Sequence, residues 1–316
     1  MNTISLKKQL NNITSIDLGV STPRLSGFIE TNSMPNLVSL SANDNDIEDF
    51  IFSLQNDNTL QEIGLNDNKL KGNVNQYLPK NIVKISLDDN LFTNIANLDK
   101  HVNLEDFRCS SNSITSNIPS TIYNTNLVTF KMFKNSMTGN IPDLSNNTAL
   151  EDYQVNNNNL TGSLPSGVIS SNVRLKVFKI GGNALLTGNI PDLSNNTELT
   201  IYEGYFTQVG GSIPNLDNNT KLIAFNSSNS GIAGSIPSLA ALPALKNLLT
   251  GNIPNLDNNT NLVKLEVKNN GLTGSIPNLD NNTKLVQLLA SGNNLSGSLP
   301  SLAALPDIEK FNVSNN

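Results

Sequence analysis

The chain has 316 residues, of which only 15% are charged and 5% are aromatic, while asparagine alone accounts for 56. A net charge of −6 argues against a nucleic-acid partner, because phosphate neutralisation needs clustered Lys and Arg. We expect no membrane insertion, since no stretch reaches the ~18 consecutive apolar residues of a membrane span.

One repeated unit covers nearly the whole chain. Aligned on its first apolar residue, it recurs every 22 to 25 residues, with one exception of 17. Such a period is typical of a solenoid, in which each unit is one coil stacked on the next. With no linker and no break in composition, we predict a single domain over residues 1–316 with about 13 coils, the last one truncated. The units begin at Ile13, Leu37, Leu60, Ile82, Leu104, Leu127, Leu150, Leu175, Leu199, Leu222, Leu245, Leu262, Leu285 and Ile308.

The pattern inside a unit is clearest at Leu262–Pro277, which reads LVKLEVKNNGLTGSIP. Apolar residues stand at unit positions 1, 4, 6 and 11, and positions 4 and 6 alternate with polar neighbours. That alternation predicts a short strand with one buried face, and stacked coils would join these strands into a parallel sheet. Because proline recurs at position 16, we expect short 3₁₀ or extended segments on the outer side rather than long helices.

Asparagine recurs at unit position 9, where the chain leaves the strand. A carboxamide both donates and accepts hydrogen bonds, so stacked asparagines can satisfy the backbone groups of adjacent coils. We therefore predict a structural ladder made of Asn45, Asn68, Asn90, Asn112, Asn135, Asn158, Asn183, Asn270 and Asn293.

The consensus LxxLxLxxNxLTGxIP resembles the leucine-rich repeat, specifically its plant-type subclass as it occurs in bacterial and bacteriophage surface proteins. The resemblance covers nearly the whole chain, and nine coils carry a version of the Gly-x-Ile-Pro half. It implies a helix-poor repeat solenoid of the α/β class, curved and right-handed, whose concave parallel sheet binds partners without enzymatic activity or a cofactor. Plant-type proteins also have cysteine-paired caps and a signal peptide, and neither is seen here.

Three acidic residues fall in one column of the first coils. Asp44, Asp67 and Asp89 all occupy unit position 8, with Glu62 and Asp88 alongside. Carboxylates about 5 Å apart repel one another, so the column would favour a cation or a basic partner. The alternative interpretation is that acidic loops simply keep the solenoid soluble.

The middle coils place bulky side chains where other coils have Asn, Ser, Asp or Gly. On a concave sheet, positions 3, 5, 7 and 8 would face outward, and exposed aromatics are common anchors of recognition. The alternative is that the strand of the Leu199 coil, which lacks the position-9 asparagine, slips by one residue and turns its aromatics into the core. The predicted partner-binding residues are Lys131, Phe133, Lys134, Val177, Lys179, Ile201, Glu203, Tyr205 and Phe206.

The 17-residue step produces a short, irregular coil near residues 245–261. Six residues are absent relative to Leu262–Gly274, so roughly 20 Å of chain path is missing. We predict that no regular strand pairs on both sides around Lys246–Leu249 and that the flanking sheets are offset. The chain also stops in mid-coil at Asn316, which suggests a fragment of something longer.

No catalytic or nucleotide-binding motif is present. His101, the single histidine, lies between coils, where we expect a solvated loop residue, and a site needing two imidazoles is excluded. Cys109 takes a core position and cannot form an internal disulfide.

The predicted function is a non-enzymatic recognition scaffold that binds a protein or a surface glycan. Its low charge and missing cysteine caps suggest adhesion or host recognition on a cell surface or a virion appendage such as a tail fibre, with a role in a larger assembly left open. Two alternatives stand beside it: a structural spacer of a fibre, and an intracellular regulator that binds one protein. A cytoplasmic location also stays open, because no signal peptide is seen.

Overall fold

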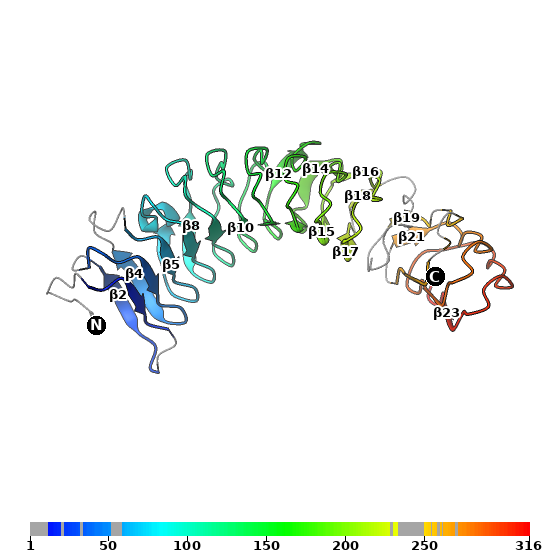
Figure 1. Cartoon of the computed structure of the whole chain (residues 1–316), viewed down its shortest axis with the longest axis horizontal. Helices are drawn as coiled ribbons and strands as arrows, with labels where there is room; N and C mark the ends of the chain where they lie inside the picture. The colour runs from blue at the N-terminus through cyan, green and yellow to red at the C-terminus, as the bar shows by residue number, and fades with distance from the viewer. Residues whose placement is uncertain are drawn as a thin grey trace. The chain divides into compact units, whose positions relative to one another are not determined.

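The computed structural model describes residues 12–19, 22–31, 34–51, 59–227, 230–232, 250–253, 255–257, 260, 262–268 and 271–316. The chain forms two compact units, residues 1–159 (unit 1) and residues 160–316 (unit 2). Both are built from the same kind of coil (Figure 1). Among the described residues, no helix combines the length and the apolar character needed to cross a bilayer.

Each described coil contributes one short strand, at unit positions 3 to 5, to one of two parallel sheets, one with ten strands and one with three strands near the C-terminus, which together we call the main sheet. Strands pair at equal unit positions, as Phe130 does with Phe107 and Tyr153, so position 4 points inward while positions 3 and 5 point outward. This confirms the predicted parallel solenoid. The main-sheet strands of unit 1 are β1 (Ser15–Asp17), β3 (Ser39–Ser41), β5 (Glu62–Gly64), β7 (Lys84–Ser86), β9 (Asp106–Arg108), β10 (Thr129–Lys131) and β11 (Asp152–Gln154); those of unit 2 are β13 (Val177–Lys179), β15 (Ile201–Glu203), β17 (Ala224–Asn226), β20 (Lys264–Glu266), β22 (Gln287–Leu289) and β23 (Lys310–Asn312).

Other strands of two to six residues, the lateral strands, pair in twos on another side of the coils. In unit 2, β12, β14, β16 and β18 follow one edge of the coils and β15 and β17 follow the other (Figure 1). The recurring proline predicted extended segments and 3₁₀ turns here but gave no sign of this pairing. The lateral elements are β2 (Ser26–Glu30) with β4 (Asp46–Ile51), β6 (Lys71–Asn73) with β8 (Leu91–Asn94), β12 (Thr161–Leu164) with β14 (Leu185–Gly188), β16 (Gly210–Gly211) with β18 (Gly231–Ile232), β19 (Thr250–Asn252) with β21 (Gly271–Thr273), and the 3₁₀ helix η1 (Val74–Tyr77).

Aromatic side chains at unit position 4 form stacks in the core. In unit 1, the rings of Phe107, Phe130 and Tyr153 stack with centroids 5.6 and 5.5 Å apart. In unit 2, Tyr202 stacks on Phe225 at 4.7 Å. Each such pair contributes about 0.5–1.5 kcal/mol beyond the area that it buries, which compensates for the scarcity of aromatic residues in the composition.

The residue at unit position 8 has a left-handed backbone in every coil where it is described, with φ between 47° and 71°. One residue in this conformation turns the chain sharply out of the strand, and Gly, Asn and Asp tolerate it better than other residues. The residues concerned are Asp44, Asp67, Asp89, Ser111, Lys134, Asn157, Gly182, Phe206, Gly292 and Asn315.

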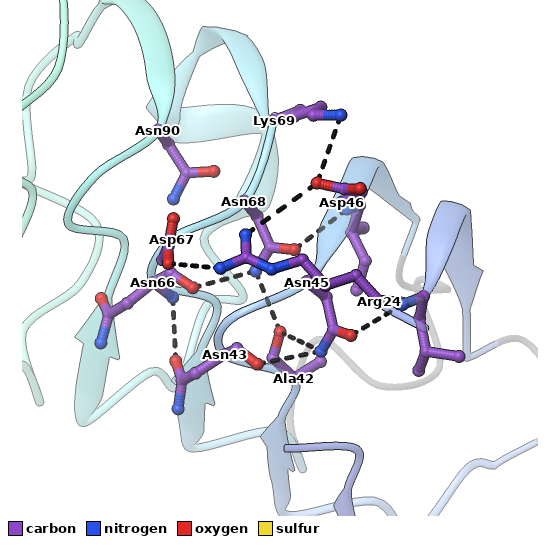
Figure 2. Close-up of polar contacts among 12 residues, drawn as sticks. Arg24, Ala42, Asn43, Asn45, Asp46, Asn66, Asp67, Asn68, Lys69 and Asn90 are labelled. Carbon is purple, nitrogen blue, oxygen red and sulfur yellow. Dashed lines mark hydrogen bonds and ion pairs between the residues drawn. The ribbon is translucent and has the colours of Figure 1, made fainter. Parts of the chain in front are cut away.

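The asparagine at position 9 then joins neighbouring coils (Figure 2). Asn68 Nδ2 donates to the backbone oxygen of Ala42 in the preceding coil at 2.9 Å and to that of Asn66 at 3.0 Å, and its Oδ1 accepts the N–H of Ile47 at 3.0 Å. The side chain is 7% exposed, so each bond satisfies a buried group that would otherwise cost about 1–3 kcal/mol. Carboxamide bonds to the preceding coil recur at Asn45, Asn90, Asn112, Asn135, Asn158, Asn183 and Asn293, whereas Asn270 lies outside the described residues.

A second asparagine column, which sequence analysis missed, lies three residues before the start of the next unit. Asn147 is fully buried, and its Nδ2 donates to the backbone oxygens of Thr121 and Asn124, both at 2.9 Å. Asn196 and Asn219 make the equivalent pairs of bonds. The repeated Asn-Asn-Thr spacer therefore has a structural reason, because its second asparagine holds one coil to the next.

His101 occupies this second column in its own coil. It is 8% exposed, so the expectation of a solvated loop histidine is wrong. Its Nδ1 lies 3.1 Å from the backbone oxygen of Pro79, and its own backbone oxygen accepts a bond from Asn124 at 2.7 Å. Cys109 is fully buried in the predicted core position, and burial raises the pKa of its thiol, which therefore keeps its proton.

The short coil predicted near residues 245–261 falls largely outside the described residues. Residues 233–249, which include Lys246–Leu249, are among those that the structure does not describe. The predicted interruption of strand pairing there stays a prediction, as does the assignment of residues 1–316 to a single domain.

Candidate partner-binding surface

One coil of unit 2 departs from the others at three adjacent positions. After β15, Tyr205 stands at position 7 and Phe206 at position 8, where most coils have small or polar residues. Thr207 then takes the place of the ladder asparagine. The unusual residues of this coil predicted a partner-binding surface, with a slipped strand as the alternative.

The strand of this coil keeps the register of its neighbours. Tyr202 is fully buried and pairs with Phe178 of the preceding strand, while Ile201 and Glu203 on either side of it are partly exposed. The slipped register is therefore wrong. Phe206 is not a core residue, since its side chain is 57% exposed.

Tyr205 is held against the preceding coil. A β-carbon built on Gly181 would lie 2.6 Å from Cδ1 of Tyr205, so the ring lies directly over that glycine and only glycine leaves it room. The rings of Tyr205 and Phe206 meet edge to face with centroids 6.0 Å apart. A ring that is already fixed loses little entropy on binding. The role of Gly181 could not be predicted from the sequence, because glycine also stands at unit position 7 in another coil, as Gly19.

Phe206 and Thr207 both depart from the pattern that the other coils follow. Phe206 has a φ of 47°, a conformation that costs L-residues about 1–2 kcal/mol and is rare for bulky side chains. Thr207 Oγ1 donates to the backbone oxygen of Gly204, within its own coil, at 2.7 Å. In other coils, the N–H group at the place of Leu186 donates to the ladder asparagine of the next coil. Here the N–H of Leu186 donates instead to the backbone oxygen of Asn183 at 3.0 Å. Several departures from the repeat pattern within one coil are typical of a functional site.

The charges beside these aromatics neutralise each other. Lys179 Nζ lies 3.1 Å from Glu203 Oε1, with the two side chains 22% and 24% exposed. Val177 and Ile201 pair across the same two strands and add apolar area. The surface is therefore apolar and aromatic with little net charge. We call it the unit 2 patch, and it consists of Val177, Lys179, Ile201, Glu203, Tyr205 and Phe206.

The other predicted binding residues lie in unit 1. Lys131 ends β10, and its Nζ is 2.7 Å from Asp152 Oδ2, so this cation already has a partner. Phe133 is partly exposed, and Lys134 is exposed at the left-handed turn position with a φ of 52°. These three residues present one aromatic ring and one exposed cation, which makes their surface more polar than the unit 2 patch.

The acidic column has a reason other than charge. Asp44, Asp67 and Asp89 all adopt the left-handed conformation, which aspartate tolerates better than most residues. Arg24 binds Asp67 within the chain, with Nη2 3.1 Å from Oδ2 (Figure 2). Across the described ranges, no group of three or more His, Cys, Asp or Glu side chains is arranged to hold a metal ion. The predicted preference of this column for a cation or a basic partner stays a prediction.

Position 7 of the first coils carries a chain of side-chain to backbone bonds. Asn43 Oδ1 accepts the N–H of Asn66, and Asn66 Oδ1 accepts the N–H of Asp88, each at 2.9 Å. Asp88 Oδ1 in turn accepts the N–H of Ser110. Burial raises the pKa of Asp88 above its ordinary value, although the bonds from Ser110 oppose the shift.

Replacing Asp88 with asparagine should raise the melting temperature at neutral pH. Asparagine keeps the acceptor for Ser110 and removes a charge from a partly buried site, as in the same column at Asn43 and Asn66. Because the raised pKa makes the native state hold its proton more tightly than the unfolded chain, wild-type stability falls as pH rises from the ordinary aspartate range upward. We expect a gain of about 0.5–1 kcal/mol at neutral pH. Thermal unfolding should show almost no gain in stability at about pH 3, where Asp88 is protonated in both the folded and the unfolded state. An equal gain at both pH values would contradict this explanation.

The chain resembles solved structures. No protein-family model and no curated protein matches its sequence. The ectodomain of the Arabidopsis thaliana membrane receptor kinase GASSHO1/SCHENGEN3, in complex with CASPARIAN STRIP INTEGRITY FACTOR 2, aligns with a TM-score of 0.74 at 23% identity, over 97% of this chain and 42% of that one. The Arabidopsis receptor kinase HAESA, with the peptide hormone IDA and the co-receptor SERK1, gives 0.68 at 23% identity over 97% and 62%. The Listeria monocytogenes internalin InlF gives 0.59 at 18% identity over 96% and 88%.

These likenesses and the observed coil establish a leucine-rich-repeat solenoid, as the sequence resemblance implied. The chain spans 42% and 62% of the lengths of the two plant proteins. At these identities the shared property is the fold, and the neighbours are receptor ectodomains and an internalin.

Proposed function

We propose that this protein is a non-enzymatic leucine-rich-repeat scaffold that binds a protein or peptide through the unit 2 patch. The observation that carries the proposal is Phe206, which is 57% exposed in a left-handed conformation unfavourable to a bulky side chain. An exposed ring in a strained position, next to a missing ladder bond, indicates selection for something other than stability. HAESA, in complex with a peptide hormone, supports a peptide or protein as the kind of partner.

We further propose that the scaffold acts in adhesion or host recognition on a cell surface or a virion appendage. Support comes from the likeness to an internalin and to the ectodomain of a membrane receptor kinase. A structural spacer is the weaker alternative, because a spacer gains nothing from strained aromatic residues. A partner that carries glycans would be compatible with the same patch, whose paired charges leave little net charge.

Panning a random-peptide display library against the full chain tests the patch without its natural partner. We expect selected peptides to be rich in apolar and aromatic residues and to bind with a Kd of about 1–100 μM. Tyr205→Ala and Phe206→Ala should each weaken binding by roughly 10- to 30-fold, because both remove an aromatic anchor.

Tyr123→Ala is the matched control, since Tyr123 is 59% exposed but lies outside the main sheet. It should leave peptide affinity unchanged. Peptides that bind equally well to the Phe206→Ala and Tyr205→Ala proteins would show that the patch is not the binding surface.

A further inference from the structure

A hollow lies among the lateral elements of unit 1, and none of the main-sheet residues that the structure describes lines it. Its volume is about 560 Å³, and its walls come from β2, β4, β6 and η1. Small-ligand sites typically have volumes of about 300–1,000 Å³. The side chains that determine its chemistry are Phe28, Glu48, Asp49, Lys71, Gln76 and Tyr77.

The local backbone opens this hollow. β2 and β4 have five and six residues and are the longest lateral strands among the described residues. Their register shifts between Gly27 and Phe28, and such an irregularity bends a strand and redirects its side chains. Phe28 is consequently 36% exposed and forms part of the wall, while Gly27, with a φ of 95°, adds no side chain to fill the space.

Hydrogen bonds hold the polar groups of the hollow in place. The Tyr77 hydroxyl lies 2.8 Å from Asp49 Oδ1, and Tyr77 is only 1% exposed. Burial, together with the bond to Asp49, raises the pKa of Tyr77, so its hydroxyl stays protonated and donates. Gln76 Nε2 donates to the backbone oxygen of Lys71 at 3.3 Å. These side chains need little reorganisation to bind a ligand.

The lining combines both signs of charge with one apolar ring. Glu48 and Asp49 supply carboxylate acceptors, and Lys71 supplies ammonium donors. With two carboxylates and one ammonium group, the lining disfavours an anionic ligand, whereas an uncharged ligand meets no net repulsion. Hydroxyl groups both donate and accept, so they can use both kinds of group, and the Phe28 ring can cover an apolar C–H face.

We propose that this hollow binds one or two uncharged pyranose units of a glycan. A pyranose ring has hydroxyl groups around its edge and C–H groups on its faces, which matches the acceptors, donors and aromatic wall described above. The site is separate from the unit 2 patch and lies in the other unit. It gives the scaffold a second binding activity that does not depend on the proposed protein partner.

Titrating the full chain with maltose, cellobiose, lactose and N,N′-diacetylchitobiose, followed by calorimetry and saturation-transfer NMR, tests the proposal. We expect at least one disaccharide to saturate with a Kd of about 0.1–1 mM. Phe28→Ala and Glu48→Gln should each weaken that affinity by roughly 10-fold, and circular dichroism should show that both variants are folded. Glu48→Gln retains the shape of an exposed side chain and keeps the test valid if the Phe28 variant does not fold.

Phe206→Ala separates this site from the proposed protein-binding function. It should leave disaccharide affinity unchanged while it weakens the peptides selected on the unit 2 patch. The proposal is overturned if none of the four sugars saturates, if affinity survives both Phe28→Ala and Glu48→Gln, or if only Phe206→Ala abolishes it. Saturation by tetramethylammonium but by none of the sugars would instead identify an ammonium site and overturn the assignment to a glycan.

Discussion

Replacing Asn158 with alanine should lower the free energy of unfolding by about 2–3 kcal/mol. Its Nδ2 donates to the backbone oxygens of Met132 at 2.9 Å and Val155 at 3.1 Å, and its Oδ1 accepts the N–H of Met137 at 3.0 Å. The side chain is 6% exposed, so alanine would leave buried backbone groups on two coils without partners. Chemical denaturation monitored by far-ultraviolet circular dichroism would measure the loss.

Asn159→Ala provides the matched control in the adjacent position. Asn159 is exposed, and its backbone N–H, which alanine retains, donates to Met137 at 2.8 Å. We expect this variant to stay within about 0.5 kcal/mol of the wild type. Equal unfolding free energies for the two variants would mean that the asparagine ladder does not hold the coils together.

Phe206→Asn should make the protein more stable while it weakens peptide binding. The side chain buries little area at 57% exposure, and asparagine adopts a φ of 47° more readily than phenylalanine does. We expect a gain of about 1 kcal/mol in unfolding free energy, measured by denaturation. The loss of the ring should weaken the selected peptides by roughly 10- to 30-fold, measured by fluorescence anisotropy with labelled peptides.

Ser111→Asn separates the two effects, because Ser111 occupies the same left-handed turn in unit 1 with a φ of 52°. It should also raise stability, by a few tenths of a kcal/mol or more, but should not change peptide affinity. Destabilisation by Phe206→Asn of the size seen for a core aromatic, about 3 kcal/mol, would show that Phe206 serves packing rather than recognition.

Much of the coil could be predicted from residue spacing. The unit starts at Leu127 and Leu150 correctly predicted a strand with position 4 buried, as Phe130 of β10 and Tyr153 of β11 show, because a period-2 pattern identifies the buried face of a strand. The role of the second spacer asparagine could not be predicted. Asn147 looks like any polar loop residue until coil stacking brings Thr121 and Asn124 within hydrogen-bond distance.

The residues of the candidate site could be predicted from the sequence, but the solvent exposure of their side chains could not. Sequence position marked Tyr205 and Phe206 as unusual, yet it left open whether they face solvent or the core, since a slip of one residue exchanges the two faces of a strand. The buried pairing of Tyr202 with Phe178 decides between them. Likewise, the acidic column that contains Asp67 suggested a site for a charged partner. Only the φ of 50° shows that Asp67 is also a turn residue with a left-handed backbone.

What the sequence by itself determined was the coil: its period, its inward strand residues and its position-9 asparagine. These follow from the chain's own covalent spacing, because strand alternation and turn formation act over a few residues. The tertiary structure alone decided which neighbours each side chain has on the adjacent coil. Gly181 and Tyr205 are 24 residues apart in the sequence yet in contact, as are Phe107 and Phe130 at 23 residues. Such contacts depend on how whole coils stack, since the packing of one coil on the next fixes which residues a side chain can reach.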